Sequence, residues 1–483
     1  MAGDRNLHKL LNTIVNSFVE LCACDGGSIF TLRKGLDGKD VLVFENMVTR
    51  SIKIEEVPEH LVNLRFTLDE DTLVSRTAKT RLPQRANFNP AAGAEARVDH
   101  VLNYATYNMM SAPLITPRGD LVGVVQLVNK LPYPSRPSAG TTPDFDQRDE
   151  RMFNIVAAQA ALAIENSLLL EEQERLLDGF VNACVTAIEE RDPVTSGHST
   201  RVSDYTVALG DAISRTETGP LKGVYFTPTQ LREIRYAAML HDIGKISVKE
   251  DVLNKEKKLH GWQLEVIRMR LKLMRSNLKL RQQATKEDLT EISRKLDNAW
   301  KMITDANEPN VLPAAVNSAL QDLSSIEVEI EDGEVLTALT KEEGFKLSIQ
   351  KGSLTTDERL EIERHVTNTF QILKMVPWSR GLELVPEIAY RHHEKLDGTG
   401  YPCKCPAADI PVQSRLLTIT DIYDALTADD RPYKRAMPTE RALDILGMEV
   451  KHGKLDSDCF KVFVEARIFE VCQKHKKAHL KAA

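Results

Sequence analysis

The sequence predicts a multidomain chain with an N-terminal α/β domain, a linking coiled-coil helix, and a C-terminal all-α domain that an inserted helical segment interrupts. Three observations support this prediction. Residues 6–168 alternate helical and strand patterns, a sevenfold apolar spacing follows, and helical periodicity dominates 178–255 and 354–475. The length of 483 residues agrees with two or three domains, so the chain is long enough to bury several cores.

The composition is that of a soluble globular protein, with 42% hydrophobic and 28% charged residues. A net charge of −7 marks neither a DNA-binding protein nor a membrane-surface protein. No run of about 18 apolar residues exists, so no membrane span is expected. Charges at Asp4, Arg5 and Lys9 interrupt the N-terminal segment, which is therefore expected to be an amphipathic helix and not a signal peptide.

The seven cysteines include two Cys-x-Cys pairs, Cys22/Cys24 and Cys403/Cys405. An odd count in a long chain favours reduced thiols and a cytoplasmic location. A Cys-x-Cys pair can bind metal, but the usual doubled Cys-x-x-Cys pattern of structural zinc sites is absent. The first pair could serve redox or metal sensing, and the simpler interpretation is two small buried residues.

Four short strands are predicted in the N-terminal domain, at Ser28–Arg33, Val41–Phe44, Met110–Ile115 and Leu121–Asn129. Turn residues separate the members of each pair. Asp37-Gly38 lies in the first turn, Gly35–Lys39, and Pro117-Arg118-Gly119-Asp120 lies in the second. Two hairpins are therefore expected, followed by a Pro- and Ser-rich loop from Leu131 to Thr142.

Four apolar residues repeat every seven positions: Ile155, Leu162, Leu169 and Leu176. This spacing places all four on one face of a helix. The face could pack on its own domain, or it could join two protomers in a coiled coil. Because the repeat lies between two domain-like segments, we favour a linking helix over 150–177 and a homodimer formed through it.

The stretch 256–351 interrupts the helical C-terminal part. Apolar residues at three- and four-residue spacing lie there among basic ones: Leu264, Ile267, Leu271, Met274 and Leu278. The pattern predicts a basic amphipathic helix, and a second helix is expected over 286–303. The simplest interpretation is an inserted helical hairpin with solvated charges. The basic helix could instead contact a partner or a nucleotide phosphate.

Five histidines and two aspartates of the C-terminal part stand out, and we expect them at helix ends: His198, His241, Asp242, His365, His392, His393 and Asp421. His241-Asp242 closes the apolar helix Ile234–Leu240, for example, and His365 follows the charged helix Glu358–Arg364. One histidine on an apolar helix is usually a packed core residue. A set of this size is better explained as ligands for Fe, Mn or Zn, and it exceeds what one tetrahedral zinc takes. Two metals therefore fit better.

Asp242 could bridge two cations, which would acidify the water between them enough to make it a nucleophile near neutral pH. Lys245 follows three residues later and would share the helix face of Asp242 if the helix continues. Phosphodiester hydrolysis needs that nucleophile, and it needs positive charge beside the phosphate oxygens.

His241-Asp242-x-x-Lys245 resembles the signature of the HD superfamily of phosphohydrolases. The run from His392 to Pro402, His-His-Glu-x-x-Asp-Gly-x-Gly-Tyr-Pro, matches the HD-GYP motif, and the resemblance covers 178–255 and 352–450. It implies an all-helical domain with a two- or three-metal centre, often Fe or Mn. Such domains linearise cyclic di-GMP to pGpG and can hydrolyse the product further to GMP.

The resemblance also implies roles for single residues. The metal ligands would be His198, His241, Asp242, His365, His392, His393 and Asp421, with Asp242 and Lys245 as catalytic residues beside the activated water and the scissile phosphate. Three side chains would face the dinucleotide: Asp424, Arg431 and Lys434. The loop Gly400-Tyr401-Pro402 would shape the edge of the substrate pocket and offer a partner surface.

Three departures from the family pattern bear on this assignment. Family members with a third metal carry a glutamate where this chain has Val194. A site for two divalent ions is therefore expected, and Fe and Mn are the favoured metals. Ala428-Asp429-Asp430 makes the spacing to Arg431 one residue longer than usual. The third departure is the insertion at 256–351, which lies between two ligand-bearing helices.

Three alternatives to cyclic di-GMP hydrolysis remain open. They are hydrolysis of 3',3'-cyclic GMP-AMP at the same site, an inert receptor for cyclic dinucleotides, and a generic HD phosphohydrolase.

Residues 6–168 resemble a GAF domain, an α/β sensor fold with a central antiparallel sheet. The resemblance rests on five residues: Asn129, Lys130, Phe145, Asp149 and Glu150. They match the motif of GAF domains that bind cyclic nucleotides, where the motif supports the pocket without touching the ligand. Lys130 and Asp149 could also simply pair across the fold. The resemblance implies cAMP or cGMP as the ligand. The alternatives are that the domain binds another small ligand or that it serves only in dimerisation.

A ligand on the GAF domain would reach the HD-GYP domain through the helix 150–177. Such regulation requires two states of the protein that differ in ligand affinity.

Overall fold

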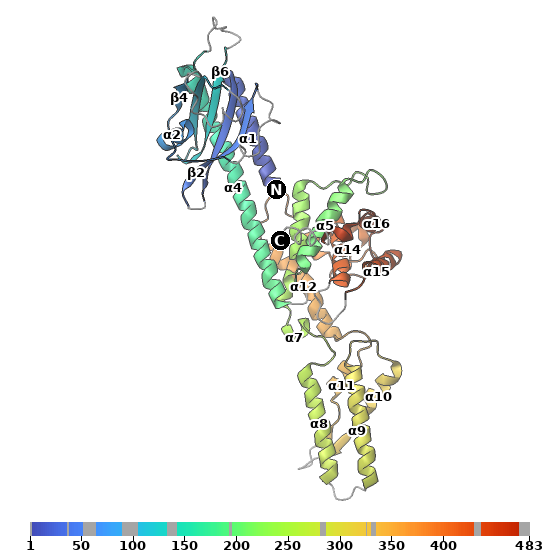
Figure 1. Ribbon diagram of the computed structural model, residues 1–483. Helices are drawn as coiled ribbons and strands as arrows, with labels where there is room; N and C mark the ends of the chain where they lie inside the picture. The colour runs from blue at the N-terminus through green and yellow to red at the C-terminus, as the bar shows by residue number, and fades with distance from the viewer. Residues whose placement is uncertain are drawn as a thin grey trace. The chain divides into compact units, whose positions relative to one another are not determined.

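The computed structural model describes residues 2–35, 38–51, 64–88, 105–132, 143–192, 196–280, 286–324, 326–329, 335–428 and 436–472. The chain forms two compact units, Met1–Asp178 and Gly179–Ala483. Figure 1 shows a sheet with helices in the first unit and an assembly of helices in the second. Most of the predicted loop 131–142 lies outside the described residues, as do Val194, Arg431 and Lys434.

The first unit is an α/β fold around a six-stranded antiparallel sheet with the strand order β3-β2-β1-β6-β5-β4. Its elements are α1 (Ala2–Leu21), β1 (Cys24–Lys34), β2 (Asp40–Thr49), β3 (Arg65–Thr67), α2 (Leu73–Thr80), β4 (Gln84–Asn87), β5 (Asn108–Ile115), β6 (Leu121–Lys130) and the start of α4 (Gln147–Arg191). The predicted strands and both hairpins are confirmed, and the strands are longer than expected. Gly119 adopts a φ of +90° in the second turn, a backbone conformation that favours glycine.

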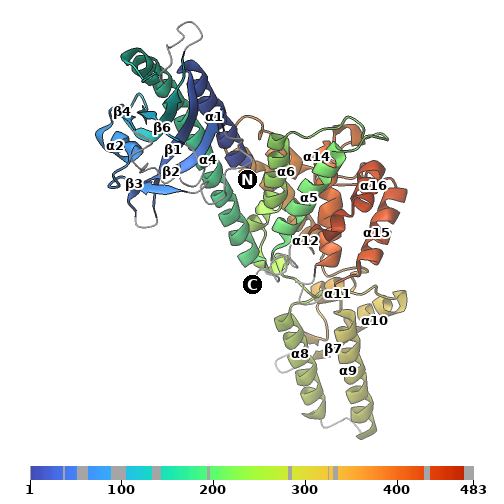
Figure 2. The same cartoon turned by 45° about the horizontal axis from the view of Figure 1, so that its top comes forward.

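Neighbouring residues of β1 point to opposite faces of the sheet, as strand geometry requires. Ile29 joins a core that includes Phe18 of α1 and Phe153 of α4. Phe30 joins a separate core on the other face, which includes Val74 of α2. Helices α1 and α4 therefore cover one face of the sheet and α2 lies at the other (Figure 2).

Lys130, at the end of β6, connects the sheet to α4 through a buried ion pair. Its ammonium lies 2.8 Å from Asp149 Oδ1, and both side chains are at most 3% exposed. The same ammonium donates to the Cys22 carbonyl at 2.5 Å and lies 5.9 Å from the centre of the Phe145 ring. The neighbouring Asn129 bonds the backbone of a loop, where its amide donates to the Ala105 carbonyl. This geometry favours the supporting role of the motif over contact with a ligand.

Cys22 and Cys24 are both buried beside this network. Burial is the main cause that raises the pKa of the Cys22 thiol to about 12, and burial likewise raises the pKa of Cys24. Reactive thiols require the opposite shift, because the thiolate is the nucleophile and the metal ligand. The structure therefore favours the interpretation of these residues as small core side chains.

Helix α4 runs to Arg191, well beyond the predicted end at 177. Phe153, Ala161 and Ile164 are buried in the first core, whereas all four residues of the sevenfold repeat are exposed: Ile155, Leu162, Leu169 and Leu176. The repeat therefore does not pack on its own domain. By length and composition alone α4 is apolar enough to cross a membrane, in contrast to the expectation from sequence. This is weak support for a span, because part of the same stretch lies in the core.

The second unit is mostly helical. It contains the end of α4, α5 (His198–Ser214), α6 (Pro228–Leu240), the 3-10 turn η5 (Ile243–Ser247), α7 (Glu250–Leu253), α12 (Thr356–Lys374), α13 (Val385–Tyr390), η7 (Ala407–Asp409), α14 (Val412–Thr427), α15 (Thr439–Lys451), α16 (Ser457–Glu465) and η8 (Ile468–Glu470). Capping boxes begin α6 at Thr227 and α12 at Thr355, so the sequence itself fixes where these helices start. Side chains such as Leu209, Tyr423 and Phe463 fill the core between α5, α14 and α16.

The insertion forms a small body with a core of its own. It comprises α8 (Gly261–Leu280), α9 (Lys286–Ala306), α10 (Ala314–Ser324), β7 (Glu327–Glu329), β8 (Val335–Thr337) and α11 (Lys341–Leu347). The insertion is mostly helical, as expected, and it also contains an antiparallel hairpin of β7 and β8 that was not predicted. The two ends of the insertion are tied together, because the Ser353 hydroxyl donates to the Lys255 carbonyl and Lys255 pairs with Glu358 at 2.7 Å.

Replacing Lys130 by Met should destabilise the first unit. The variant leaves Asp149 buried without its cation, and loss of one partner of a buried pair costs about 3–5 kcal/mol. Hydrogen exchange of peptides from β6 and α4 measures this loss for the first unit separately. Lys34→Met, which removes a largely exposed pair with Asp40, is the matched control and should change protection by less than about 0.5 kcal/mol. Equal protection in both variants would contradict the bracing role.

Candidate metal centre

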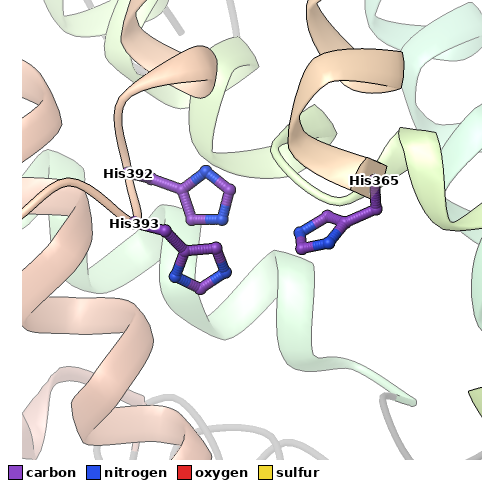
Figure 3. Close-up of side chains that lie close together, drawn as sticks. All are labelled: His365, His392 and His393. Atoms are coloured by element: carbon purple, nitrogen blue, oxygen red, sulfur yellow. The ribbon is translucent and has the colours of Figure 1, made fainter. Parts of the chain in front are cut away.

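All seven side chains predicted as metal ligands converge in the interior of the second unit. The described part of the chain contains three groups of three potential ligand residues. Within each group, the ligand atoms lie within 4.8 Å of one another. Together they contain His198, His241, Asp242, His365, His392, His393 and Asp421 and no further residue. Figure 3 shows the rings of His365, His392 and His393, which face one another across a small space.

The ligands come from segments far apart in sequence. His198 begins α5, His241 and Asp242 follow α6, and His392 lies in the turn after α13. The expectation that all of them lie at helix ends is wrong for two residues. His365 lies in the middle of α12, which continues past the predicted end at Arg364, and Asp421 lies in the middle of α14.

Asp242 occupies the centre of the cluster. Its Oδ1 lies 3.2 Å from His365 Nε2, and its Oδ2 lies 3.4 Å from His241 Nε2 and 2.9 Å from Lys245 Nζ. The two carboxylate oxygens therefore face different histidines. A carboxylate in this position can contribute one oxygen to each of two cations.

Asp421 forms the second carboxylate of the cluster. Its Oδ1 lies 3.1 Å from His198 Nε2 and 3.8 Å from His241 Nε2. The other nitrogen of His198, Nδ1, donates to Asp424 Oδ2 at 2.8 Å, and Arg201 also donates to Asp424. Asp424 thus orients His198 from behind.

Three further histidines are oriented in the same manner by their own helices. Nδ1 of His241, His365 and His392 each donates at 2.6 Å to a carbonyl three residues earlier in the chain. This leaves Nε2 as the free lone pair in each ring and points it toward the centre. Metal-binding histidines in proteins are commonly held by this kind of second hydrogen bond.

The chemistry of these atoms fits a metal site. Nε2 of His241, His365 and His392 is buried and has no hydrogen-bond partner among the described residues. A buried polar atom without a partner costs free energy, so native proteins rarely contain three of them in one place. Divalent cations bound by neutral imidazole and carboxylate would satisfy all three atoms.

The protonation states agree with this fit. Burial, aided by the neighbouring histidine charges, lowers the pKa of His392 well below its usual value, and burial lowers that of His393 to about 3. Both rings are therefore neutral near pH 7, which is the metal-binding form. Burial opposes ionisation of Asp242, but Lys245 and His241 outweigh it and hold the pKa of Asp242 well below its usual value.

His198 differs from the other rings. Burial disfavours its charged form, but hydrogen bonds to Asp421 and Asp424 outweigh burial and raise its pKa to about 9. In the absence of a metal, the two carboxylates therefore hold a proton on His198. A cation bound at this place would supply the positive charge that the proton now provides.

Close packing between η5 and α12 brings Asp242 and His365 together. A Cβ on Gly244 would lie 1.9 Å from the His365 carbonyl oxygen, so no side chain fits there. The Thr369 hydroxyl accepts from Gly244 N at 2.9 Å and donates to the His241 carbonyl at 3.0 Å. This glycine and threonine fix the distance between the two ligand-bearing segments.

Lys245 is held beside the cluster by two carboxylates. Its ammonium lies 2.9 Å from Asp242 Oδ2 and 3.1 Å from Asp192 Oδ2. The condition that the helix continues past Asp242 is not met, because α6 ends at Leu240. A 3-10 turn places Lys245 next to Asp242 instead. Burial opposes the charge on Lys245, but Asp242 and Asp192 outweigh it and raise its pKa. Lys245 therefore presents a permanent positive charge.

The segment after His393 forms a tight loop around Glu394. The buried Glu394 carboxylate accepts backbone N–H groups of Cys403, Lys404 and Cys405 at 2.5, 3.1 and 3.3 Å. A Cβ on Gly400 would lie 2.3 Å from Lys395 N, so glycine is required where the loop passes its own beginning.

Within this loop, the peptide bond between Tyr401 and Pro402 is cis. The Tyr401 ring lies 4.7 Å from the His393 ring, centre to centre. The predicted loop Gly400-Tyr401-Pro402 therefore borders the cluster.

The site contains functional candidates that the sequence analysis did not select. Asp192 holds Lys245, Arg201 holds Asp424, and Glu394 closes the loop after His393. Glu394 belongs to the quoted motif and Arg201 lies three positions after His198, whereas nothing in the sequence around Asp192 indicated its contact with Lys245. The prediction that Asp424 faces a dinucleotide is not favoured, because Asp424 is 1% exposed and fully engaged with His198 and Arg201.

Comparison with known protein families gives two matches. Residues 6–164 match the model of the GAF domain, and residues 340–459 match the model of the HD domain. The HD match includes His365, His392, His393 and Asp421. His198, His241 and Asp242 lie before it, so the structure joins residues from inside and outside the matched range.

Several curated proteins are related to the chain. The 3'3'-cGAMP-specific phosphodiesterase 3 of Vibrio cholerae is 33% identical over 319 residues, which is 66% of this chain and 43% of that protein. The 3'3'-cGAMP-specific phosphodiesterase 1 of the same organism is 37% identical over 144 residues, 29% of this chain and 32% of that protein. A cyclic di-GMP phosphodiesterase of Pseudomonas aeruginosa is 35% identical over 115 residues, 24% of this chain and 27% of that protein. The matched region thus spans less than half the length of each relative.

Among solved structures, the GAF-B domain of DevS from Mycobacterium smegmatis covers 35% of this chain and 98% of its own length, at 16% identity and a TM-score of 0.24. A GAF domain/HD domain protein from Geobacter sulfurreducens covers 35% of this chain and 97% of its own length, at 10% identity and a TM-score of 0.27.

Replacing Asp242 by Ala should abolish metal binding, because both oxygens that face His241 and His365 are lost. The expected fall in metal affinity is more than about 100-fold, larger than the 10–100-fold effect of losing a supporting group. Metal content per chain after dialysis against a weak chelator measures it. His452→Ala removes an exposed histidine outside the cluster and should retain the metal. Wild-type metal content in the Asp242→Ala protein would refute the central position of this carboxylate.

Proposed function

Because the chain contains a GAF domain at 6–164 and an HD domain at 340–459 and is related to cyclic dinucleotide phosphodiesterases, we propose that it is a metal-dependent hydrolase of cyclic dinucleotides. The observation that carries the proposal is the buried cluster of five histidines and two aspartates, in which three Nε2 atoms have no partner among the described residues. The donor set suits two divalent cations, and we propose Fe or Mn.

When bound, the cations would lower the pKa of water and polarise a phosphoryl oxygen. The protein residues contribute position and charge. Asp242 and Asp421 each face two histidines, and the Nδ1 hydrogen bonds fix the direction of the rings. The Lys245 ammonium, held by Asp192 and Asp242, supplies positive charge for a phosphate oxygen that gains negative charge as the phosphodiester bond breaks.

We propose cyclic di-GMP as the substrate, with linear pGpG as the first product and GMP as a possible second product. The related protein from Pseudomonas aeruginosa is a cyclic di-GMP phosphodiesterase, which supports this choice. The second candidate is 3',3'-cyclic GMP-AMP. The relative that supports it is a 3'3'-cGAMP-specific phosphodiesterase, whose alignment covers 66% of this chain. A receptor that binds a cyclic dinucleotide without hydrolysing it is the non-enzymatic alternative.

For the GAF domain we propose a small polar ligand, with cAMP or cGMP first. Three polar residues stand side by side across β1, β6 and β5, since Ser28 pairs with Gln126 and Gln126 pairs with Ser111. They lie on the face of the sheet that carries Phe30 and not on the face packed by α1. The Ser111 hydroxyl is buried and has no hydrogen-bond partner among the described residues, which supports a polar group of a ligand at this place.

We further propose a homodimer that forms through the exposed sevenfold repeat of α4. A parallel pair of these helices would bury Ile155, Leu162, Leu169 and Leu176 of both copies against one another. The repeat lies on the helix that links the sensor to the metal centre, so a ligand that changes the pairing could change activity. A cytoplasmic location is proposed with it, and the seven free cysteines agree with this.

Hydrolysis should require Lys245. Lys245→Met is expected to lower kcat for cyclic di-GMP by about 100- to 1,000-fold, the usual effect of removing one group that stabilises transition-state charge. Lys245 supports Asp242 without being a ligand, so metal affinity should fall by no more than about 10–100-fold, and turnover is compared at saturating metal. Turnover of cyclic di-GMP and of 3',3'-cyclic GMP-AMP, followed by chromatography of the products, gives both the effect and the substrate preference. Lys249→Met, at an exposed lysine nearby, is the control.

If wild-type protein loaded with Fe or Mn binds cyclic di-GMP but returns both dinucleotides intact, the receptor alternative replaces the proposed enzyme. Faster turnover of 3',3'-cyclic GMP-AMP would instead keep the enzyme and change its substrate.

The double variant Leu169→Glu/Leu176→Glu should weaken self-association of the full chain. Four carboxylates would then face one another across a parallel α4 pair, where like charges repel. Sedimentation analysis at several protein concentrations measures the association. Glu165→Gln on the same helix is the control and should associate as the wild type does. Unchanged association of the double variant would exclude α4 as the dimer contact.

A further inference from the structure

Helix α8 of the insertion has two apolar faces, and its own body covers only one of them. Ile267, Leu271 and Met274 are buried in the core of the insertion, against residues of α9 such as Ile303. This face was predicted from sequence. The second face consists of Trp262, Val266, Met269 and Leu273, here called the outer stripe of α8, and all four of its side chains are exposed.

The outer stripe differs from a typical solvent-exposed helix face in two respects, the regular spacing of its residues and their apolar character. Its residues are four, three and four positions apart, which is the seam of a coiled coil. Trp262 is 67% exposed and Met269 is 63% exposed. Tryptophan and methionine are enriched at protein interfaces, and contiguous apolar patches on a surface commonly mark such interfaces.

The basic residues of α8 do not make this surface a phosphate-binding site. Arg270 is held by Glu343 through two bonds of 2.7 and 3.0 Å, and Arg275 pairs with Asp297. Arg268 pairs with Glu265 at 3.4 Å and lies over the Trp300 ring. The acidic residues of the insertion itself therefore neutralise these cations, which disfavours the contact with nucleotide phosphate considered from the sequence.

One edge of the outer stripe carries one residue of each charge. Glu265 and Lys272 are seven positions apart and flank the stripe on the same side, directly before Val266 and Leu273. Lys272 is exposed and makes no ion pair within the described residues. This edge can complement an identical copy of itself when the copy runs in the opposite direction, because each Glu265 then meets a Lys272.

We propose that the outer stripe of α8 binds the same stripe of a second copy of the chain, antiparallel and about a twofold axis. Trp262 then faces Leu273 of the second copy, and Val266 faces Met269, so a larger side chain meets a smaller one in every layer. Two Glu265–Lys272 pairs, related by the axis, flank the contact. The interface is isologous, as twofold contacts between identical chains are.

A parallel pair is the less favourable arrangement. It would place Trp262 against Trp262 and leave Lys272 opposite Asn277. In a parallel pair the partner of Glu265 would be Arg270, which Glu343 already holds in a two-bond pair. In the antiparallel arrangement the partner of Glu265 is Lys272, which makes no other ion pair among the described residues. The proposal does not depend on the function of the metal centre or on association through α4.

Charge reversal tests both the contact and its direction. Glu265→Lys and Lys272→Glu should each weaken self-association of the full chain by about tenfold, because two attractive pairs become repulsive. The double variant Glu265→Lys/Lys272→Glu should return to within about threefold of the wild type. A parallel pair would not recover, because the cation introduced at position 265 would still face Arg270. Sedimentation analysis of the purified chain gives the association constants.

Trp262→Glu/Met269→Glu should remove this association step altogether, while any step through α4 remains. Phe345→Glu, at an exposed aromatic residue of α11 in the same insertion, is the matched control and should associate as the wild type does. Circular dichroism checks that each variant is folded. A monomeric wild type, unchanged association of the Trp262/Met269 variant, or failure of the charge-reversed double variant to recover would each overturn the proposal.

Discussion

The second unit is organised around a requirement to keep imidazole nitrogens buried and directed at one point. Nε2 of His241, His365 and His392 has no hydrogen-bond partner among the described residues, and two carboxylates lie between the rings. Such an arrangement is costly unless cations occupy it. The surrounding contacts all serve to maintain it. Backbone carbonyls hold the outer nitrogen of each of these rings, and Asp424 does the same for His198.

This requirement explains features from distant parts of the second unit. Gly244 is small because α12 must approach η5 closely enough for His365 to reach Asp242. Thr369 bonds both to that glycine and to the His241 carbonyl, so it fixes the same distance. Glu394 ties the loop after His393 to its own beginning and sets Tyr401 beside the His393 ring. The insertion can vary without disturbing the cluster because it has a separate core and joined ends.

Local patterns in the sequence predicted much of this arrangement. The hairpins followed from Gly38 and Gly119 in turns between apolar runs. The seven proposed ligands were selected as a set of histidines and aspartates and through the resemblance to the HD-GYP motif. Contacts between distant segments could not be predicted in this way. Asp192 meets Lys245, and Arg201 meets Asp424, across 53 and 223 positions of the chain. The continuation of α12 past His365 and the β7–β8 hairpin were also missed, because a charged helix gives no local signal for its end and a short acidic hairpin lacks an apolar alternation.

The most direct test of the central claim is the metal content of the full chain purified without oxygen, measured together with its product profile on cyclic di-GMP. Two equivalents of Fe or Mn per chain, with linear pGpG formed and both lost on chelation, are the predicted result. A folded chain that holds no metal after purification and after incubation with Fe or Mn, and leaves the dinucleotide intact, would contradict the account.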